Sequence, residues 1–105
     1  MTQHPVVVTI RYQAHPEQAA RARQALSTLI ATVVASEPDC LGIQLLQDPD
    51  DETRILLYER WTSREAYAGP HMHTPHLTAF MLTARELFGG PPAIEYWRLL
   101  DDVTL

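Results

Sequence analysis

The stretch RILLYERWTSRE, residues 54–65, decides the fold class of this chain. From Ile55 to Trp61 every second side chain is one of Ile, Leu, Glu and Trp, which is the alternation of a β-strand with one buried face. The next four residues, Thr62–Glu65, match the T-x-x-E capping box, so we expect a helix to begin there. A strand that passes directly into a capped helix predicts a mixed α and β domain.

The residues before this stretch predict a strand, a long helix and a second strand. Val6–Tyr12 is rich in β-branched residues and predicts the first strand. A helix is expected from about Pro16 to Glu37, where Pro38 ends it. Its apolar stripe recurs at helical spacing and consists of Ala22, Leu26, Leu29, Ile30 and Val33. Leu41–Leu46 predicts the next strand, and the polar turn at residues 48–52 joins it to residues 54–61 as a hairpin.

The residues after the capping box predict a broken helix and a last strand. Gly69 and Pro70 interrupt the first helical segment, and Thr74 caps a second one with Pro75 at its first position. Residues 89–92, GGPP, end it before a strand at 94–100. The order β-α-β-β-α-β predicts one ferredoxin-like α+β domain over residues 1–105, with a four-stranded antiparallel sheet and the helices on one face.

The face of the sheet without helices needs its own cover. The strands have apolar or aromatic residues on both faces, as Leu56 and Tyr58 against Leu57, and Trp97 against Tyr96, show. Leaving such a face in water is costly, and a second copy of the same sheet is the simplest symmetric cover. We therefore expect a homodimer through the open sheet face.

Composition excludes several classes of partner. The formal net charge is −5 and the basic residues are scattered, so we expect no nucleic acid partner. No apolar run is long enough for a transmembrane helix, and MTQHP at residues 1–5 has no basic segment typical of a signal peptide. Cys40 is the single cysteine and cannot form an intramolecular disulfide. A cytoplasmic location fits best.

The run from Tyr58 to Tyr67, followed by HMHTPH at 71–76 and by Phe80, resembles the core of the antibiotic biosynthesis monooxygenase family. That core has E-x-W, a short helix, and H-x-x-x-x-H with Ser/Thr-Pro before the second His. The resemblance implies a dimeric α+β barrel with a substrate cavity between sheet and helices. Members of the family include cofactor-independent monooxygenases of aromatic polyketides and quinols, haem-degrading enzymes and an isomerase.

The histidines are the sharpest candidates for chemistry. His71 and His76 match the family's pair, and His73 is an additional one. His76 lies just inside a helix start, where the helix dipole favours the neutral imidazole that can accept a proton. The alternatives are a solvated loop histidine at 71 and a helix-start hydrogen bond to Thr74 or backbone at 76. Pro75 breaks the spacing, and neither a Cys nor an evident carboxylate lies nearby, so we expect no metal.

The other candidates come from the strand at 54–61 and the helices that follow. The expected catalytic residues are His76, His71 and Tyr67. The phenol of Tyr67 is expected to form a hydrogen bond with a substrate oxygen. The expected substrate contacts are Trp61, Glu59, Leu57 and Phe80. Trp61 offers a flat wall, and Glu59, if buried, would have a raised pKa. The structural alternatives are a core Trp61, a packing Tyr67, and a Glu59 paired with Arg64 or Arg85.

Two departures from the family's known chemistries weaken the assignment of a reaction. Ile10 and Leu57 stand where the haem-degrading members and the polyketide oxygenases, respectively, have Asn. The expected function is a monooxygenase that oxidises a small electron-rich aromatic with O₂ and without a cofactor. An isomerase or haem-modifying enzyme, or a non-catalytic binding or stress-associated protein, remains an alternative on the same scaffold.

Overall fold

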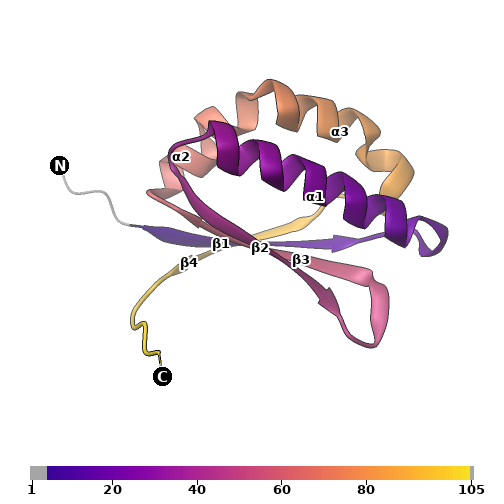
Figure 1. Cartoon of the computed structure of the whole chain (residues 1–105), viewed down its shortest axis with the longest axis horizontal. Coiled ribbons are helices and arrows are strands. Elements are labelled where there is room, and N and C mark those ends of the chain that lie inside the picture. The colour runs from indigo at the N-terminus through magenta and orange to yellow at the C-terminus, as the bar shows by residue number, and fades with distance from the viewer. Residues whose placement is uncertain (1–4, 105) are drawn as a thin grey trace.

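The computed structural model describes residues 5–104 and contains one four-stranded sheet with its helices on one face (Figure 1). The signal-peptide expectation rests largely on residues 1–4, which lie outside the described part. The elements are β1 (Val6–Gln13), η1 (Pro16–Gln18), α1 (Ala19–Ser36), β2 (Cys40–Asp48), β3 (Asp51–Trp61), α2 (Arg64–Ala68), η2 (Pro70–His73), α3 (Pro75–Leu87) and β4 (Ala93–Arg98).

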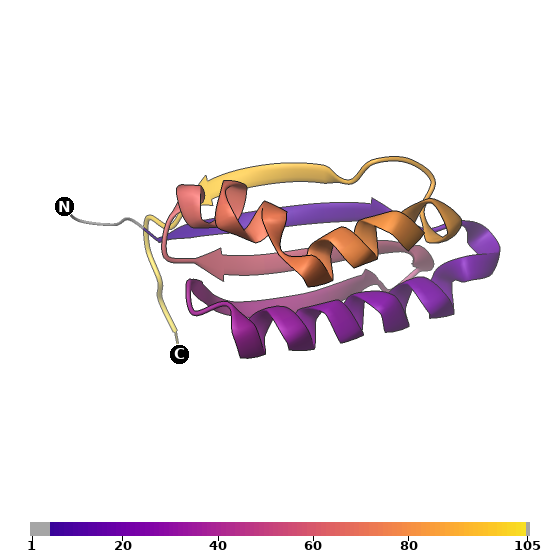
Figure 2. The ribbon, with the colours of Figure 1, turned by 90° about the horizontal axis from the view of Figure 1, so that it is seen from above.

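The sheet has the order β2-β3-β1-β4, and every neighbouring pair is antiparallel. Seen from above, α1 runs along the β2 edge of the sheet, and α2 and α3 lie over the rest of the same face (Figure 2). This arrangement is the ferredoxin-like α+β fold, so the predicted fold class is confirmed.

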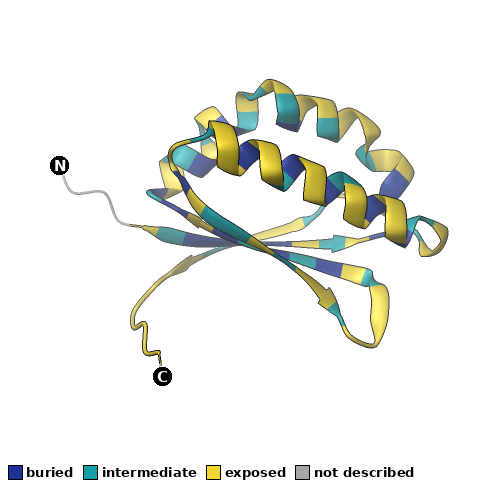
Figure 3. Ribbon diagram, in the orientation of Figure 1, coloured by how far each residue is buried: buried dark blue, intermediate teal, exposed yellow. Residues whose placement is uncertain are grey.

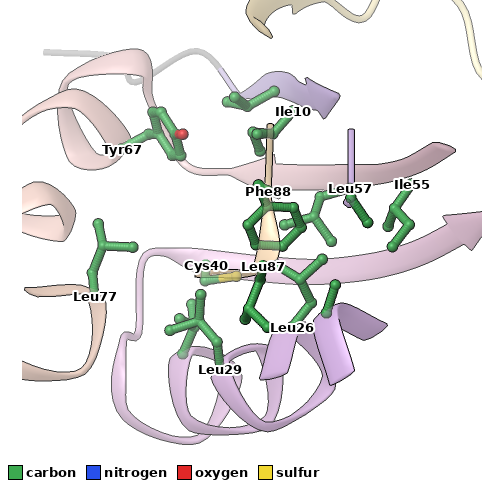
Figure 4. Packing of buried hydrophobic residues seen from close by; sticks show 14 of the residues in the cluster. Ile10, Leu26, Leu29, Cys40, Ile55, Leu57, Tyr67, Leu77, Leu87 and Phe88 are labelled. Carbon is green, nitrogen blue, oxygen red and sulfur yellow. The ribbon is translucent and has the colours of Figure 1, made fainter. Parts of the chain in front are cut away.

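The core lies between α1 and the helix-covered face of the sheet. The stripe of α1 supplies Leu26 and Val33, which pack with Val8 of β1 and Leu57 of β3. Figure 3 shows buried positions of the helices facing the sheet and exposed positions facing away from it. Figure 4 shows the same interior from close by, with Leu26 and Leu29 of α1 below the strands.

Local boundaries differ from the sequence prediction in two instructive places. A 3₁₀ turn, η1, precedes α1, so the long helix begins at Ala19 instead of Pro16. The cap of α2 is Ser63, whose Oγ accepts from the backbone N–H of Ala66 at 3.1 Å. Thr62, the expected cap, instead donates to Asp39 at 2.9 Å and ties β3 to the α1–β2 corner.

The face of the sheet opposite the helices exposes apolar side chains. The register pairs Arg11 with Leu56 and Val7 with Trp97, all on this open face. Trp97 is 53% exposed and Leu46 is 44% exposed. No helix within residues 5–104 has the length and apolarity needed to cross a membrane.

Candidate functional site

A cavity of about 410 Å³ lies between the sheet and the helices. Its lining is mostly apolar and includes Leu57 of β3 and Phe80 of α3, two of the predicted substrate contacts. Tyr12 of β1 joins this wall and packs edge-on against Phe80, with 6.3 Å between ring centroids. The polar side chains that reach the cavity include Glu59, Tyr67 and His71.

Glu59 is a carboxyl group buried on the helix-covered face of β3. Its Oε1 accepts a hydrogen bond of 2.8 Å from the indole Nε1–H of Trp61. Burial raises the pKa of Glu59 to about 7, although the Trp61 hydrogen bond works in the opposite direction and the charge of Glu37 adds to the rise. Glu59 can therefore gain or lose a proton near neutral pH.

The sequence offered Arg64 and Arg85 as ion-pair partners for Glu59, and neither forms that pair within the described residues. The Arg64 guanidinium instead lies over the Tyr96 ring, 4.1 Å from its centroid. Arg85 is an exposed residue that contributes to the cavity lining. Without a cationic partner the buried carboxyl retains its raised pKa.

Trp61 stands behind the cavity wall. Its side chain is only 1% exposed, and it is not part of the cavity lining within the described chain. The indole packs against His71 and Tyr67, with ring centroids 4.7 and 5.6 Å away. Trp61 thus orients three polar groups of the cavity, namely Glu59, Tyr67 and His71.

Tyr67 of α2 brings a phenol into the interior (Figure 4). Its ring is stacked on His71 at 5.1 Å. Burial is the main cause that raises the pKa of Tyr67 far above the usual value, and burial likewise raises the pKa of Tyr12. Both phenols stay protonated at neutral pH and can donate a hydrogen bond to a ligand oxygen.

His71 and His76 share one carboxylate, that of Glu37. The Nδ1 atom of His71 lies 2.9 Å from Glu37 Oε1, and the Nε2 atom of His76 lies 2.6 Å from Glu37 Oε2. His71, in η2, is buried and lines the cavity. His76, in the first turn of α3, is not part of the cavity lining in the described chain. The sequence alternatives for this pair, a solvated His71 and a His76 bonded to Thr74, are not realised.

Glu37 is the site residue that the sequence reasoning missed. It ends α1, where its backbone N–H donates to the carbonyl of Val33 and Pro38 follows. Its partners lie 34 and 39 positions further along the chain. A Glu at a helix end before Pro was the available signal, but no local spacing links it to the histidines.

His73 is exposed, so η2 presents His71 inward and His73 outward. Within residues 5–104, no group of three His, Cys, Asp or Glu side chains has the arrangement needed to hold a metal ion. The polar side chains of the site are joined by hydrogen bonds, which link Glu59 with Trp61 and Glu37 with the two histidines.

The fold and this interior site define a class of small α+β proteins with a cavity beneath their helices. The family model for antibiotic biosynthesis monooxygenases matches residues 5–82, and the chain belongs to that family.

Solved structures with the same fold support the assignment. A Mycobacterium tuberculosis protein is 27% identical, with a TM-score of 0.81 over 95% of this chain and 99% of its own. A Caulobacter crescentus protein, provisionally described as an antibiotic biosynthesis monooxygenase, is 27% identical with a TM-score of 0.84 over 94% of this chain and 92% of its own. A Bacteroides thetaiotaomicron protein of unknown function, 16% identical with a TM-score of 0.80 over 93% of this chain and 100% of its own, shares the fold.

A curated relative also matches most of the chain. It is an uncharacterized protein of a Synechocystis strain, 27% identical over 81 residues, which are 77% of this chain. The match covers 54% of that relative, so the chain spans about half of its length.

Proposed function

We propose that this protein is a monooxygenase that oxidises a small electron-rich aromatic, such as a phenol, quinol or anthrone, with O₂ and without a cofactor. The observation that carries the proposal is the apolar cavity with Glu59, Tyr67 and His71 grouped around Trp61. Its volume of about 410 Å³ is in the range of small-molecule sites, roughly 300–1,000 Å³.

The polar groups of the cavity suit the removal of a proton from a bound ring. His71 has its Nδ1 atom against Glu37, so its other nitrogen can act as the base. Tyr67 stays protonated and can donate to the substrate oxygen as negative charge develops there. Apolar walls such as Leu57 and Phe80 keep water from the reactive ring.

The oxidation then needs no external reductant. For anthrone, the base takes a proton from the methylene carbon, and the resulting carbanion gives electrons to O₂ and forms a carbon–oxygen bond. The hydroperoxide loses water as the carbonyl forms. One oxygen atom enters the ring, and the other leaves as water with the two hydrogens that the carbon gave up.

The proposal includes a homodimer through the open face of the sheet and a location in the cytoplasm. Leu46, Leu56 and Trp97 form the apolar part of that face. Burying such a face recovers about 25 cal/mol for each Å² of apolar area. Antibiotic biosynthesis monooxygenases are generally dimeric, which supports the same pairing here.

The test is oxygen uptake by the purified protein with anthrone and a panel of quinols, with no cofactor added and the quinone product identified by mass spectrometry. We expect uptake by the wild type, and a loss of kcat of about 100-fold or more in His71→Gln if His71 is the base. His76→Gln is the comparison for the second candidate base, and His73→Gln is the matched control on the exposed side of η2.

Two outcomes contradict the proposal. No uptake over the whole panel by a folded dimer would point to a binding protein instead. Uptake that is unchanged in both His71→Gln and His76→Gln would leave the reaction without its assigned base.

A further inference from the structure

The Glu37 carboxylate links the cavity to the surface through two imidazoles. His71 Nδ1 lies 2.9 and 3.0 Å from the two Glu37 oxygens, and His76 Nε2 lies 2.6 Å from Oε2. The side chains of His71, Glu37 and His76 are 6, 12 and 19% exposed, so exposure increases along the chain of hydrogen bonds. The cavity is at the buried end, because His71 is one of its lining residues.

An ionised carboxylate only accepts hydrogen bonds, so both bonded ring nitrogens must carry hydrogen. His71 is then held as the Nδ1–H tautomer with a lone pair on Nε2, and His76 as the Nε2–H form with a lone pair on Nδ1. We propose that Glu37 is a positioning residue that fixes His71 as a proton acceptor and stabilises the imidazolium that forms, and that His76 holds the Glu37 carboxylate in place. The inference rests on the proposed function for the identity of the proton donor.

The proton stays on His71 between two steps. His71 Nε2 takes a proton from the substrate, and the imidazolium that forms keeps its Nδ1–H bond to Glu37. The Glu37 carboxylate stabilises this positive charge, while the Nε2–H of His76 holds the carboxylate in place. Because the oxidation releases water and no net proton, His71 returns its proton to the leaving oxygen when the O–O bond breaks.

Other titratable groups face this carboxylate. The Glu37 charge contributes to the raised pKa values of Cys40, in β2, and of Glu59, in β3, although burial is the main cause for both. Tyr67 stacks on the His71 ring from α2. The pKa values of all three are raised, so none of them supplies a positive charge beside the Glu37 carboxylate.

The experiment uses ¹⁵N-histidine-labelled full-length protein without substrate. We expect the ring ¹⁵N shifts to show one Nδ1–H tautomer for His71 in the wild type, and a mixture of tautomers in Glu37→Gln. His76→Gln keeps a hydrogen-bond donor for Glu37, so we expect its His71 to keep the wild-type tautomer. His73→Gln is the matched control and should match the wild type.

Turnover supplies an independent readout with anthrone as the probe. The kcat of Glu37→Gln should fall by about tenfold or more, because its amide neither fixes the His71 tautomer nor carries a negative charge that stabilises the imidazolium. His76→Gln should lose much less, because a glutamine amide can still donate to Glu37. Circular dichroism melting curves identify any variant that is merely unfolded, and His76→Asn then replaces His76→Gln.

The outcomes separate the role of Glu37 from the reaction. The proposal is wrong if His71 keeps one tautomer in Glu37→Gln, or if Glu37→Gln oxidises anthrone as fast as the wild type. Zinc or iron(II) that shifts both histidine signals at equimolar concentration would replace the positioning role with a metal site. Expected spectra without oxidation of any substrate would overturn the proposed function and leave the positioning role of Glu37 standing.

Discussion

Glu59 is a buried carboxyl group whose ionisation opposes folding. Burial raises its pKa from 4.5 to about 7, so ionising it inside the protein costs free energy that the unfolded chain does not spend. An apolar residue in its place would be easier to bury. The hydrogen bond of 2.8 Å from the Trp61 indole stabilises the carboxylate and offsets part of the cost of ionising it.

The pH dependence of stability follows from the sign of this shift. Because the folded state binds the proton more tightly, the stabilisation is complete below pH 4.5 and is lost as pH rises to about 7. The shift corresponds to about 3 kcal/mol. Glu59→Gln keeps an acceptor for Trp61 and has no charge to bury, so its stability should decline less over this range. Urea unfolding of both proteins at pH 5 and pH 8 measures the difference, and parallel changes would contradict it.

Individual residues were predictable to different degrees. Glu59 and Tyr67, which lie in one continuous motif with Trp61, both reach the cavity. The sequence could not show that Trp61 lies behind the cavity wall. Strand alternation predicts which face of the sheet a side chain is on, but not whether that side chain lines the cavity. Glu37 was missed because its hydrogen bonds join residues far apart in the chain.

At the scale of elements, the short helix α2 determines where Tyr67 enters the interior. It has only five residues, Arg64–Ala68, which is too short to be stable alone. Its first turn depends on the cap from Ser63, which is itself buried.

Ser63→Ala should therefore reduce the free energy of unfolding by about 1 kcal/mol, the usual cost of a lost N-cap. Ser27→Ala, on the exposed side of α1, is the control and should be neutral or slightly stabilising. Chemical denaturation measures both. Equal effects would mean that the Ser63 cap does not stabilise α2.

The elements were more predictable than their ends. The apolar stripe correctly placed Ala22, Leu26, Leu29 and Val33 of α1 in the core. The cap was predicted one residue early, because Thr62 and Ser63 both have a hydroxyl and only the structure shows that Asp39 engages Thr62.

At the scale of the whole molecule, the open face of the sheet is the surface through which we propose that two copies pair. Leu56 is central on this face, and its neighbour in β1 is Arg11. A carboxylate at position 56 has that cation beside it in a monomer, but it meets a second apolar sheet in a dimer.

Leu56→Glu should therefore convert a dimer to a folded monomer, as sedimentation velocity would show. Leu82→Glu, at an 80% exposed position of α3, is the control and should leave the assembly unchanged. A Leu56→Glu protein that sediments like the wild type would exclude the open face as the interface.

The reactivity of the Cys40 thiol reports on the opening of the corner between α1 and β2. Cys40 is buried, and burial is the main cause that raises its thiol pKa, so little reactive thiolate exists in the native protein. Maleimide should therefore label the native chain slowly, and labelling should accelerate in urea as the corner opens. Cys40 lies three residues beyond Glu37, whose carboxylate is hydrogen-bonded to both histidines. The labelling rate of Cys40 therefore measures how often the segment around Glu37 opens.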